Sequence, residues 1–210
     1  MGTLKVDNLQ KRDGTALITD GAATSNLLSE SALRTTDVGM VKLLDTSASS
    51  STSFEIDSTY INSTYNNYKI IVGYQYVTDN VGLNIRFFVG GSEVSANYAY
   101  ENAALTSSTY NYDADAGSTM QVGGASGNAT GETGTLTFEL TNVNSTTIAT
   151  RIHGLQHSVN NNGNTIGYAF QAGQDTSAYT SVVNGLKFYM CSGNIIVRHF
   201  KLYGLTYWEH

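Results

Sequence analysis

From residue 40 onward, apolar and polar side chains alternate one by one in a series of short runs. In the run 82–91, for example, Leu83, Ile85 and Phe87 are separated by single residues. A period of two places every second side chain on the same face of a strand, so these runs predict half-buried β-strands. The predicted strands cover 40–46, 52–57, 68–77, 82–91, 134–143, 147–155, 165–173, 184–192 and 194–208.

Gly- and Asn-rich turns separate these strands, without helices between them. The segments 89–93 and 191–195 predict hairpins, the second of which would pair the last two strands with each other. Many short strands joined in this way predict an all-β fold, an antiparallel β-sandwich of jelly-roll-like form. We expect the sandwich over residues 46–210, a separate arm over residues 1–45, and a polar linker at 45–53, between them.

The arm has too few apolar residues to form a core of its own. In its opening segment, residues 3–20, the large apolar positions are Leu4, Val6, Leu9, Leu17 and Ile18, in two short runs around a charged turn. Two such runs form at most a hairpin with no third strand, and a lone hairpin is marginally stable in water. We therefore expect an assembly arm, which becomes rigid by pairing its backbone with another chain. One or two helical turns are expected within residues 24–34.

Charge narrows the classes of partner. The chain has 11 basic and 17 acidic residues, a net charge of −6, and its basic residues are scattered singly along the sequence apart from the adjacent pair Lys11 and Arg12. Nucleic acids and anionic membranes attract clustered Lys and Arg, so neither is expected as a partner. No apolar stretch approaches the ~20 residues that span a bilayer, and no secretory signal is evident. We expect synthesis in a cytoplasm, without membrane insertion.

Catalytic and cofactor motifs are missing from the sequence, so we expect neither an enzyme nor a cofactor. His153 and His157 have a metal-like spacing only on a helix, because on a strand they lie about 13 Å apart. Asp113 and Asp115 resemble the opening of a calcium loop, but its closing acidic residue is missing. We expect an exposed turn there, with ion binding left open. Cys191 lies in an apolar run and is expected to be a buried, inert thiol.

Tyrosine is concentrated between residues 98 and 112. Tyr98, Tyr100, Tyr110 and Tyr112 lie there among Asn, Asp and Glu residues. Such rings can stack on sugars while neighbouring amides and carboxylates bond the hydroxyl groups, which makes the four residues candidates for glycan contact. The alternative, which we favour, is that they alternate on strands and pack on the sandwich or between subunits.

The opening segment resembles the N-terminal segment of virion proteins from tailed phages, especially tail-fibre-like proteins and capsid appendages of marine and cyanobacterial phages. The matching residues are Lys5, Val6, Asp7, Leu9, Gln10, Gly14, Thr15, Leu17 and Ile18. The segments 61–72 and 200–205 are similar to the strand entry and the closing strand of the β-sandwich in such proteins. The resemblance implies a homo-oligomer, with a trimer favoured, that docks on other virion proteins through its arm.

These observations together predict a non-enzymatic phage virion protein. Its arm would anchor it, and its sandwich would project as a tail-fibre-like or appendage domain, with host attachment as a candidate role. One alternative is a capsid decoration or cement protein that stabilises the head, and another is a module that binds host surface glycan. A depolymerase is the least favoured, since it needs two carboxylates facing each other across a cleft.

Overall fold

A computed structural model of the chain describes residues 9–10, 16–19, 22–23, 39–78, 81–104, 110–124, 126–160, 162–174 and 181–206. Every regular element in these ranges is a β-strand, which confirms the all-β prediction. The chain divides into two units, one made of Met1–Val41 with Thr206–His210 and the other of Lys42–Leu205. Each unit is described by itself below.

The first unit contains a small antiparallel sheet in the order β1-β2-β3. Its strands are β1 (Leu9–Gln10), β2 (Ala16–Thr19) and β3 (Ala22–Ala23). The register places Ile18 opposite Leu9 on one side and opposite Ala23 on the other. The expectation that the arm lacks a third strand is therefore wrong, because the chain turns back after β2. Leu4, Val6 and the helical turns expected at 24–34 lie outside the described residues.

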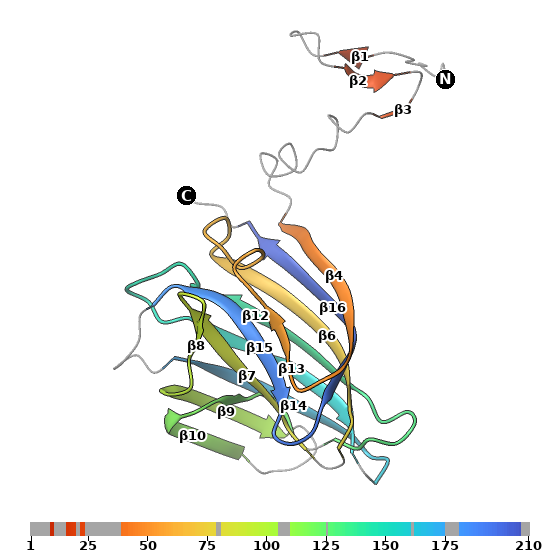
Figure 1. Cartoon of the computed structure of the whole chain (residues 1–210), viewed down its shortest axis with the longest axis vertical. Helices are drawn as coiled ribbons and strands as arrows, with labels where there is room; N and C mark the ends of the chain where they lie inside the picture. Colours follow the sequence, from red (N-terminus) through yellow and green to blue (C-terminus); the bar gives the residue numbers. More distant parts are fainter. Residues whose placement is uncertain are drawn as a thin grey trace. The chain divides into compact units, whose positions relative to one another are not determined.

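The second unit contains two antiparallel sheets, which confirms the predicted sandwich (Figure 1). The eight-stranded sheet has the order β10-β9-β14-β13-β12-β6-β16-β4, and the five-stranded sheet has the order β11-β7-β15-β5, with β8 paired to β7. The strands of the larger sheet are β4 (Met40–Ser51), β6 (Asn67–Tyr76), β9 (Tyr98–Ala104), β10 (Tyr110–Gly117), β12 (Gly134–Thr141), β13 (Arg151–Val159), β14 (Thr165–Gln174) and β16 (Ile195–Leu205). Those of the smaller sheet are β5 (Phe54–Ile56), β7 (Leu83–Val89), β8 (Ser92–Glu93), β11 (Met120–Gln121) and β15 (Val183–Met190).

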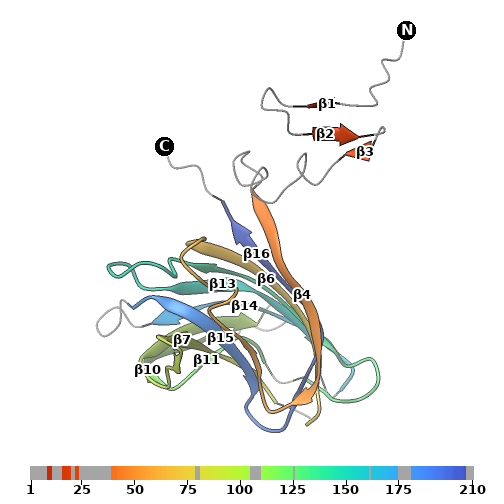
Figure 2. The same cartoon turned by 45° about the horizontal axis from the view of Figure 1, so that its top comes forward.

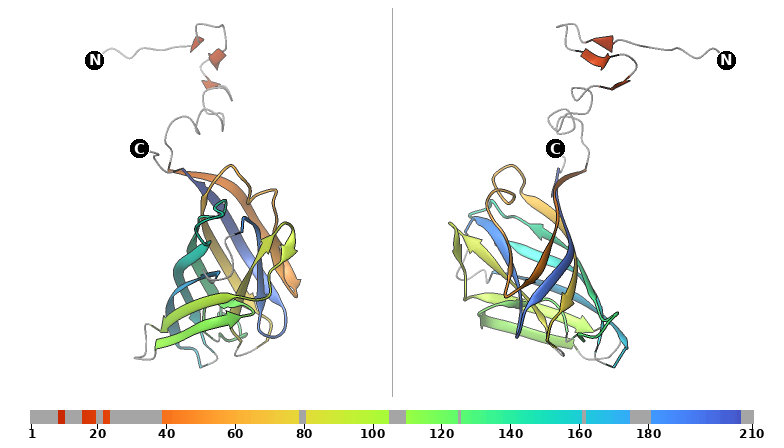
Figure 3. Two further views of the ribbon diagram at one scale, coloured as in Figure 1. Left: turned by 90° about the vertical axis from the view of Figure 1, so that its left-hand side faces the viewer. Right: turned by 45° about the vertical axis from the view of Figure 1, so that its right-hand side comes forward.

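Phenylalanine rings fill the space between the two sheets. Phe188 on β15 lies 6.2 Å from Phe138 on β12 and 5.9 Å from Phe200 on β16, measured between ring centroids. All three side chains are almost fully buried. Both sheets therefore turn their apolar face inward, as the alternation predicts, and the views in Figure 3 show the two layers face to face.

Two local expectations are wrong at the ends of strands. The linker expected at 45–53 belongs, as far as Ser51, to β4, which lies beside β16 (Figure 2). The turn at 191–195 does not pair the last two strands, because β15 belongs to the five-stranded sheet and β16 to the eight-stranded one. The chain uses this turn, with Gly193 at φ 75°, to cross between layers. The hairpin at 89–93 is confirmed, with Gly90 and Gly91 at positive φ.

Candidate functional site

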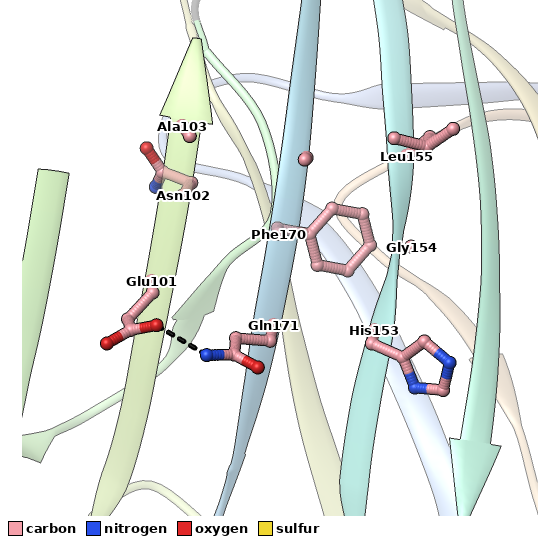
Figure 4. A pocket seen from close by; sticks show the side chains of 9 residues that line it. Glu101, Asn102, Ala103, His153, Gly154, Leu155, Phe170 and Gln171 are labelled. Atoms are coloured by element: carbon pink, nitrogen blue, oxygen red, sulfur yellow. Dashed lines mark hydrogen bonds between the residues drawn. The ribbon is translucent and has the colours of Figure 1, made fainter. Parts of the chain in front are cut away.

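A shallow hollow of about 420 Å³ lies on the eight-stranded sheet, where β9, β14 and β13 run side by side (Figure 4). Its lining comes from three consecutive residues on each strand. These residues are Glu101, Asn102, Ala103, His153, Gly154, Leu155, Ala169, Phe170 and Gln171. The pairing of β9 with β14 brings together residues such as Glu101 and Gln171, which are 70 positions apart in the sequence.

The strand register explains the shape of the hollow. Gln171 lies opposite Glu101 on one side and His153 on the other, and its amide nitrogen donates a hydrogen bond to the Glu101 carboxylate. In the next row on the same face, Ala169 lies opposite Leu155. The small alanine leaves space beside the leucine, whose side chain is 58% exposed. Polar and apolar groups therefore lie next to each other, as on surfaces that bind polar ligands with apolar faces.

A glycine in the core supports the hollow from the opposite face of the sheet. Gly154 lies between Phe138 and Phe170 in the strand register, and the centroids of these two rings are 6.3 Å apart. A Cβ atom on Gly154 would come within 2.2 Å of the Thr137 carbonyl oxygen and 2.5 Å of the Phe138 Cβ. The absence of a side chain at residue 154 thus lets both rings pack beneath the part of the sheet that carries the hollow.

The polar row of the hollow continues across the sheet. From His153 it passes to Glu139 on β12, Lys69 on β6 and Tyr203 on β16, each directly opposite the previous residue. The His153 Nε2 lies 3.7 Å from a Glu139 carboxylate oxygen. We call the six residues of this line the polar row: Glu101, Gln171, His153, Glu139, Lys69 and Tyr203.

The four tyrosines that are candidates for glycan contact lie in different environments. Tyr98 is 1% exposed, so it packs in the core, as the favoured alternative predicts, and the glycan-contact alternative is wrong for this residue. Its hydroxyl accepts a hydrogen bond from the Phe87 amide at 2.8 Å and donates one to the Val94 carbonyl at 3.0 Å. Tyr100 is half-buried on the same strand. Tyr110 and Tyr112 lie opposite Ala103 and Glu101 in the β9–β10 register, while their side chains lie outside the described part of the chain.

A buried polar cluster lies inside the sandwich, away from this face. Gln156 donates a hydrogen bond to the Tyr74 hydroxyl at 2.9 Å, and the Tyr76 hydroxyl donates one to the same oxygen at 3.3 Å. Burial raises the pKa of Tyr74 to about 12 and that of Tyr76 well above its usual value. Both phenols are therefore neutral at ordinary pH, and the cluster is a structural part of the core.

The remaining predicted sites lie apart from one another. His153 and His157 lie on strand β13, and within the described ranges no group of three or more His, Cys, Asp or Glu is placed to hold a metal ion. Asp113 and Asp115 belong to β10, so the turn expected there is wrong. Cys191 is exposed, contrary to expectation, because the turn that contains it lies outside the core. Its sulfur accepts a hydrogen bond from the Asn84 amide at 3.2 Å.

Most residues of the hollow were not among the sequence-based candidates. Glu101, Gln171 and Leu155 have outward positions in alternating runs, and the sequence shows that alternation. Which strands lie next to each other depends on long-range pairing, so the alternation alone could not bring these three residues together.

Comparison with known proteins does not assign the chain to a family. No family model matches it, and no curated protein matches it significantly. Among solved structures, it is similar to the crystal structure of a protein of unknown function from Shewanella oneidensis MR-1, with 8% sequence identity over 82% of each chain and a TM-score of 0.26. A likeness at this level supports no argument about function. Within the described residues, no helix is long and apolar enough to cross a membrane.

Proposed function

We propose that this chain is a non-enzymatic structural protein of a phage virion, anchored through its N-terminal arm. The observation that supports the proposal most strongly is the division between a large sandwich and a separate unit whose sheet has strands of two, four and two residues. Strands this short provide few backbone hydrogen bonds and little burial. A neighbouring virion protein that pairs with them would supply both.

The resemblance of residues 5–18 to tailed-phage virion proteins supports the same proposal. In this account the sandwich projects outward as a tail-fibre-like or appendage domain, and the protein is a homo-oligomer, with a trimer favoured. A decoration or cement role on the capsid uses the same anchoring. Gold-labelled antibody on intact particles distinguishes these locations, since a label spread over the capsid lattice excludes the tail-fibre version.

Deletion of residues 2–20 tests the anchoring role. We expect the shortened protein to keep its sandwich and to be missing from purified particles, as measured by mass spectrometry of the particles and circular dichroism of the free protein. The substitution Tyr60→Ala serves as the control, because Tyr60 belongs to the sandwich and to neither the hollow nor the polar row. It should leave incorporation unchanged. Incorporation of the shortened protein at the parent level would contradict the proposal.

A second function, binding of host surface polysaccharide, is favoured by the hollow beside the polar row. Its carboxylate, amide and imidazole groups can bond sugar hydroxyls, and exposed Leu155 can contact the apolar face of a sugar ring. Tyr110 and Tyr112 are placed by register on the neighbouring strand. We expect the variants Glu101→Ala/Gln171→Ala and Tyr110→Ala/Tyr112→Ala to weaken adsorption to host cells, with Tyr60→Ala as control. Unchanged adsorption of both variants would exclude the hollow as the binding site.

A further inference from the structure

Strand pairing brings one distant basic side chain to a group of three others on the outer face of β6 and β16. These are Lys69, Arg198, His199 and Lys201, which we call the basic strip. Arg198 and His199 are exposed, whereas Lys69 and Lys201 are half-buried. The strip is cationic on a chain whose net charge is −6. A local charge opposite in sign to that of the whole molecule favours a partner that carries negative charge.

Strand register places the two lysines close together. Lys201 lies directly opposite Ile71, and Lys69 is two residues away from Ile71 on the same strand. This diagonal arrangement separates the two residues by roughly 7–8 Å. Neither lysine forms an ion pair with any part of the chain that the structure describes. Two like charges at this distance repel each other, and an anion bound between them would remove the repulsion.

Neighbouring contacts hold the other end of the strip in place. The His199 ring lies over Gly73, because a Cβ atom on that glycine would come within 2.1 Å of the imidazole Cε1. The Arg198 guanidinium donates a hydrogen bond from Nε to the Gln75 side-chain oxygen at 3.2 Å. The guanidinium is thus held by a neutral amide rather than by a carboxylate, so its charge remains available to a ligand.

Three other cations of the sandwich lie beside carboxylates, in contrast to the lysines of the strip. Lys187 lies 2.6 Å from a Glu93 carboxylate oxygen, and Arg86 lies 2.5 Å from the other oxygen of the same group. Lys42 lies 3.2 Å from Asp45. The lysines of the strip therefore differ from these cations in two ways. They have no carboxylate partner within the described residues, and they lie on the outer face of β6 and β16.

We infer that the basic strip binds an acidic polysaccharide, a sugar chain that carries repeated carboxylate groups among its hydroxyl groups. Glu139 lies directly opposite Lys69, so acceptors and donors alternate here instead of forming a purely cationic surface. This mixture suits a ligand with both hydroxyl and anionic groups. It disfavours nucleic acid, whose dense phosphate charges the glutamate would repel. The inference deepens the second function proposed above but rests on the side chains of the strip rather than on those that line the hollow, so the two can fail separately.

Binding of the full-length protein to alginate, with neutral dextran as reference, tests the inference. A fluorophore on exposed Cys191, the one cysteine of the chain, reports binding by a change in diffusion. We expect alginate to bind more tightly than dextran and its affinity to fall as salt is raised. The double variant Lys69→Gln/Lys201→Gln should weaken alginate binding by about fivefold and leave dextran binding unchanged.

Two matched variants separate the strip from total charge. The variant Lys5→Gln/Lys11→Gln removes the same charge from the arm and should bind alginate like the parent, whereas Glu139→Gln removes a negative charge beside Lys69 and should bind more tightly. Equal alginate affinity of the parent and the strip variant, or single-stranded DNA that binds at least as tightly as alginate, would overturn the inference. Weakened binding in the strip variant but not in Glu101→Ala/Gln171→Ala would retain the strip and reject the hollow.

Discussion

The single side chain of Tyr98 links the two sheets. Its ring lies on β9 of the larger sheet, 5.7 Å from the Phe87 ring on β7 of the smaller sheet, measured between centroids. Its hydroxyl joins the Phe87 amide to the Val94 carbonyl, so it links the two ends of the β7–β8 hairpin. The sequence shows a tyrosine in an alternating run but not that its hydroxyl finds backbone partners inside, which is why glycan contact could be expected for it.

The substitution Tyr98→Phe tests this structural role. It keeps the ring but leaves the buried Phe87 amide without its acceptor, so we expect a loss of about 1–3 kcal/mol in the free energy of unfolding. Chemical denaturation measures the change. Tyr203→Phe, on the outer face, should change stability by less than about 0.5 kcal/mol. Equal stabilities for the two variants would show that the Tyr98 hydroxyl does not support the fold.

The buried phenol of Tyr74 gives a pH dependence with a defined sign. Its pKa is about 12 in the folded protein because of burial, against a usual value near 10. The folded state therefore keeps the proton longer than the unfolded state, and the stabilising contribution is complete below pH 10 and is lost as pH rises through 12. The loss in the free energy of unfolding amounts to about 3 kcal/mol.

Denaturation curves of the parent and of Tyr74→Phe at several pH values between 8 and 12 measure this contribution. The parent should lose stability more steeply than the variant above pH 10, since Tyr76 and Tyr98 remain in both proteins. At pH 8 the free energy of unfolding of the variant should be about 1 kcal/mol lower than that of the parent, because the variant lacks the hydrogen bond from Gln156. Parallel pH profiles would contradict the account of Tyr74.

At the scale of strands and turns, the packing of β12, β13 and β14 depends on Gly154. Its neighbours in the register are Phe138 and Phe170, whose rings meet over it. The substitution Gly154→Ala would press a methyl group against the Thr137 carbonyl, a backbone atom that cannot swing aside. We expect a loss of about 1–3 kcal/mol in the free energy of unfolding.

Thermal and chemical unfolding of Gly154→Ala and Leu155→Ala give a matched comparison on one strand. Leu155 is 58% exposed, so its truncation should cost less than about 0.5 kcal/mol. If Gly154→Ala is as stable as Leu155→Ala, the sheet has room for a side chain at residue 154, and the account of this row is wrong.

The turn residues predict where strands end, but not always which sheet the next strand joins. Gly90 and Gly91 indicate a hairpin, and the structure has one between β7 and β8. Gly193 marks an equally clear turn, yet the chain there crosses to the other sheet. A turn fixes a local change of direction, whereas the choice of sheet depends on pairing with strands far away in the sequence, such as β6 with β16.

At the scale of the whole chain, the strand alternation predicted the sandwich and most of its strands. The hollow and the polar row were harder to predict, because they join strands whose order in the sheet is unrelated to their order in the sequence. The basic strip is the clearest case. Lys69 lies far from the other three residues in the sequence, and only the pairing of β6 with β16 brings Lys69 and Lys201 together.

The central claim of this account is that the sandwich is stable by itself and that the small N-terminal sheet needs a partner chain. Amide hydrogen exchange of the free, full-length protein tests the claim most directly, because it measures local stability strand by strand. We predict that amides of β1, β2 and β3 exchange many times faster than those of β12 and β6 in the core sheet. Equal protection of both groups would show that the N-terminal sheet is stable without a partner, and would contradict the anchoring function.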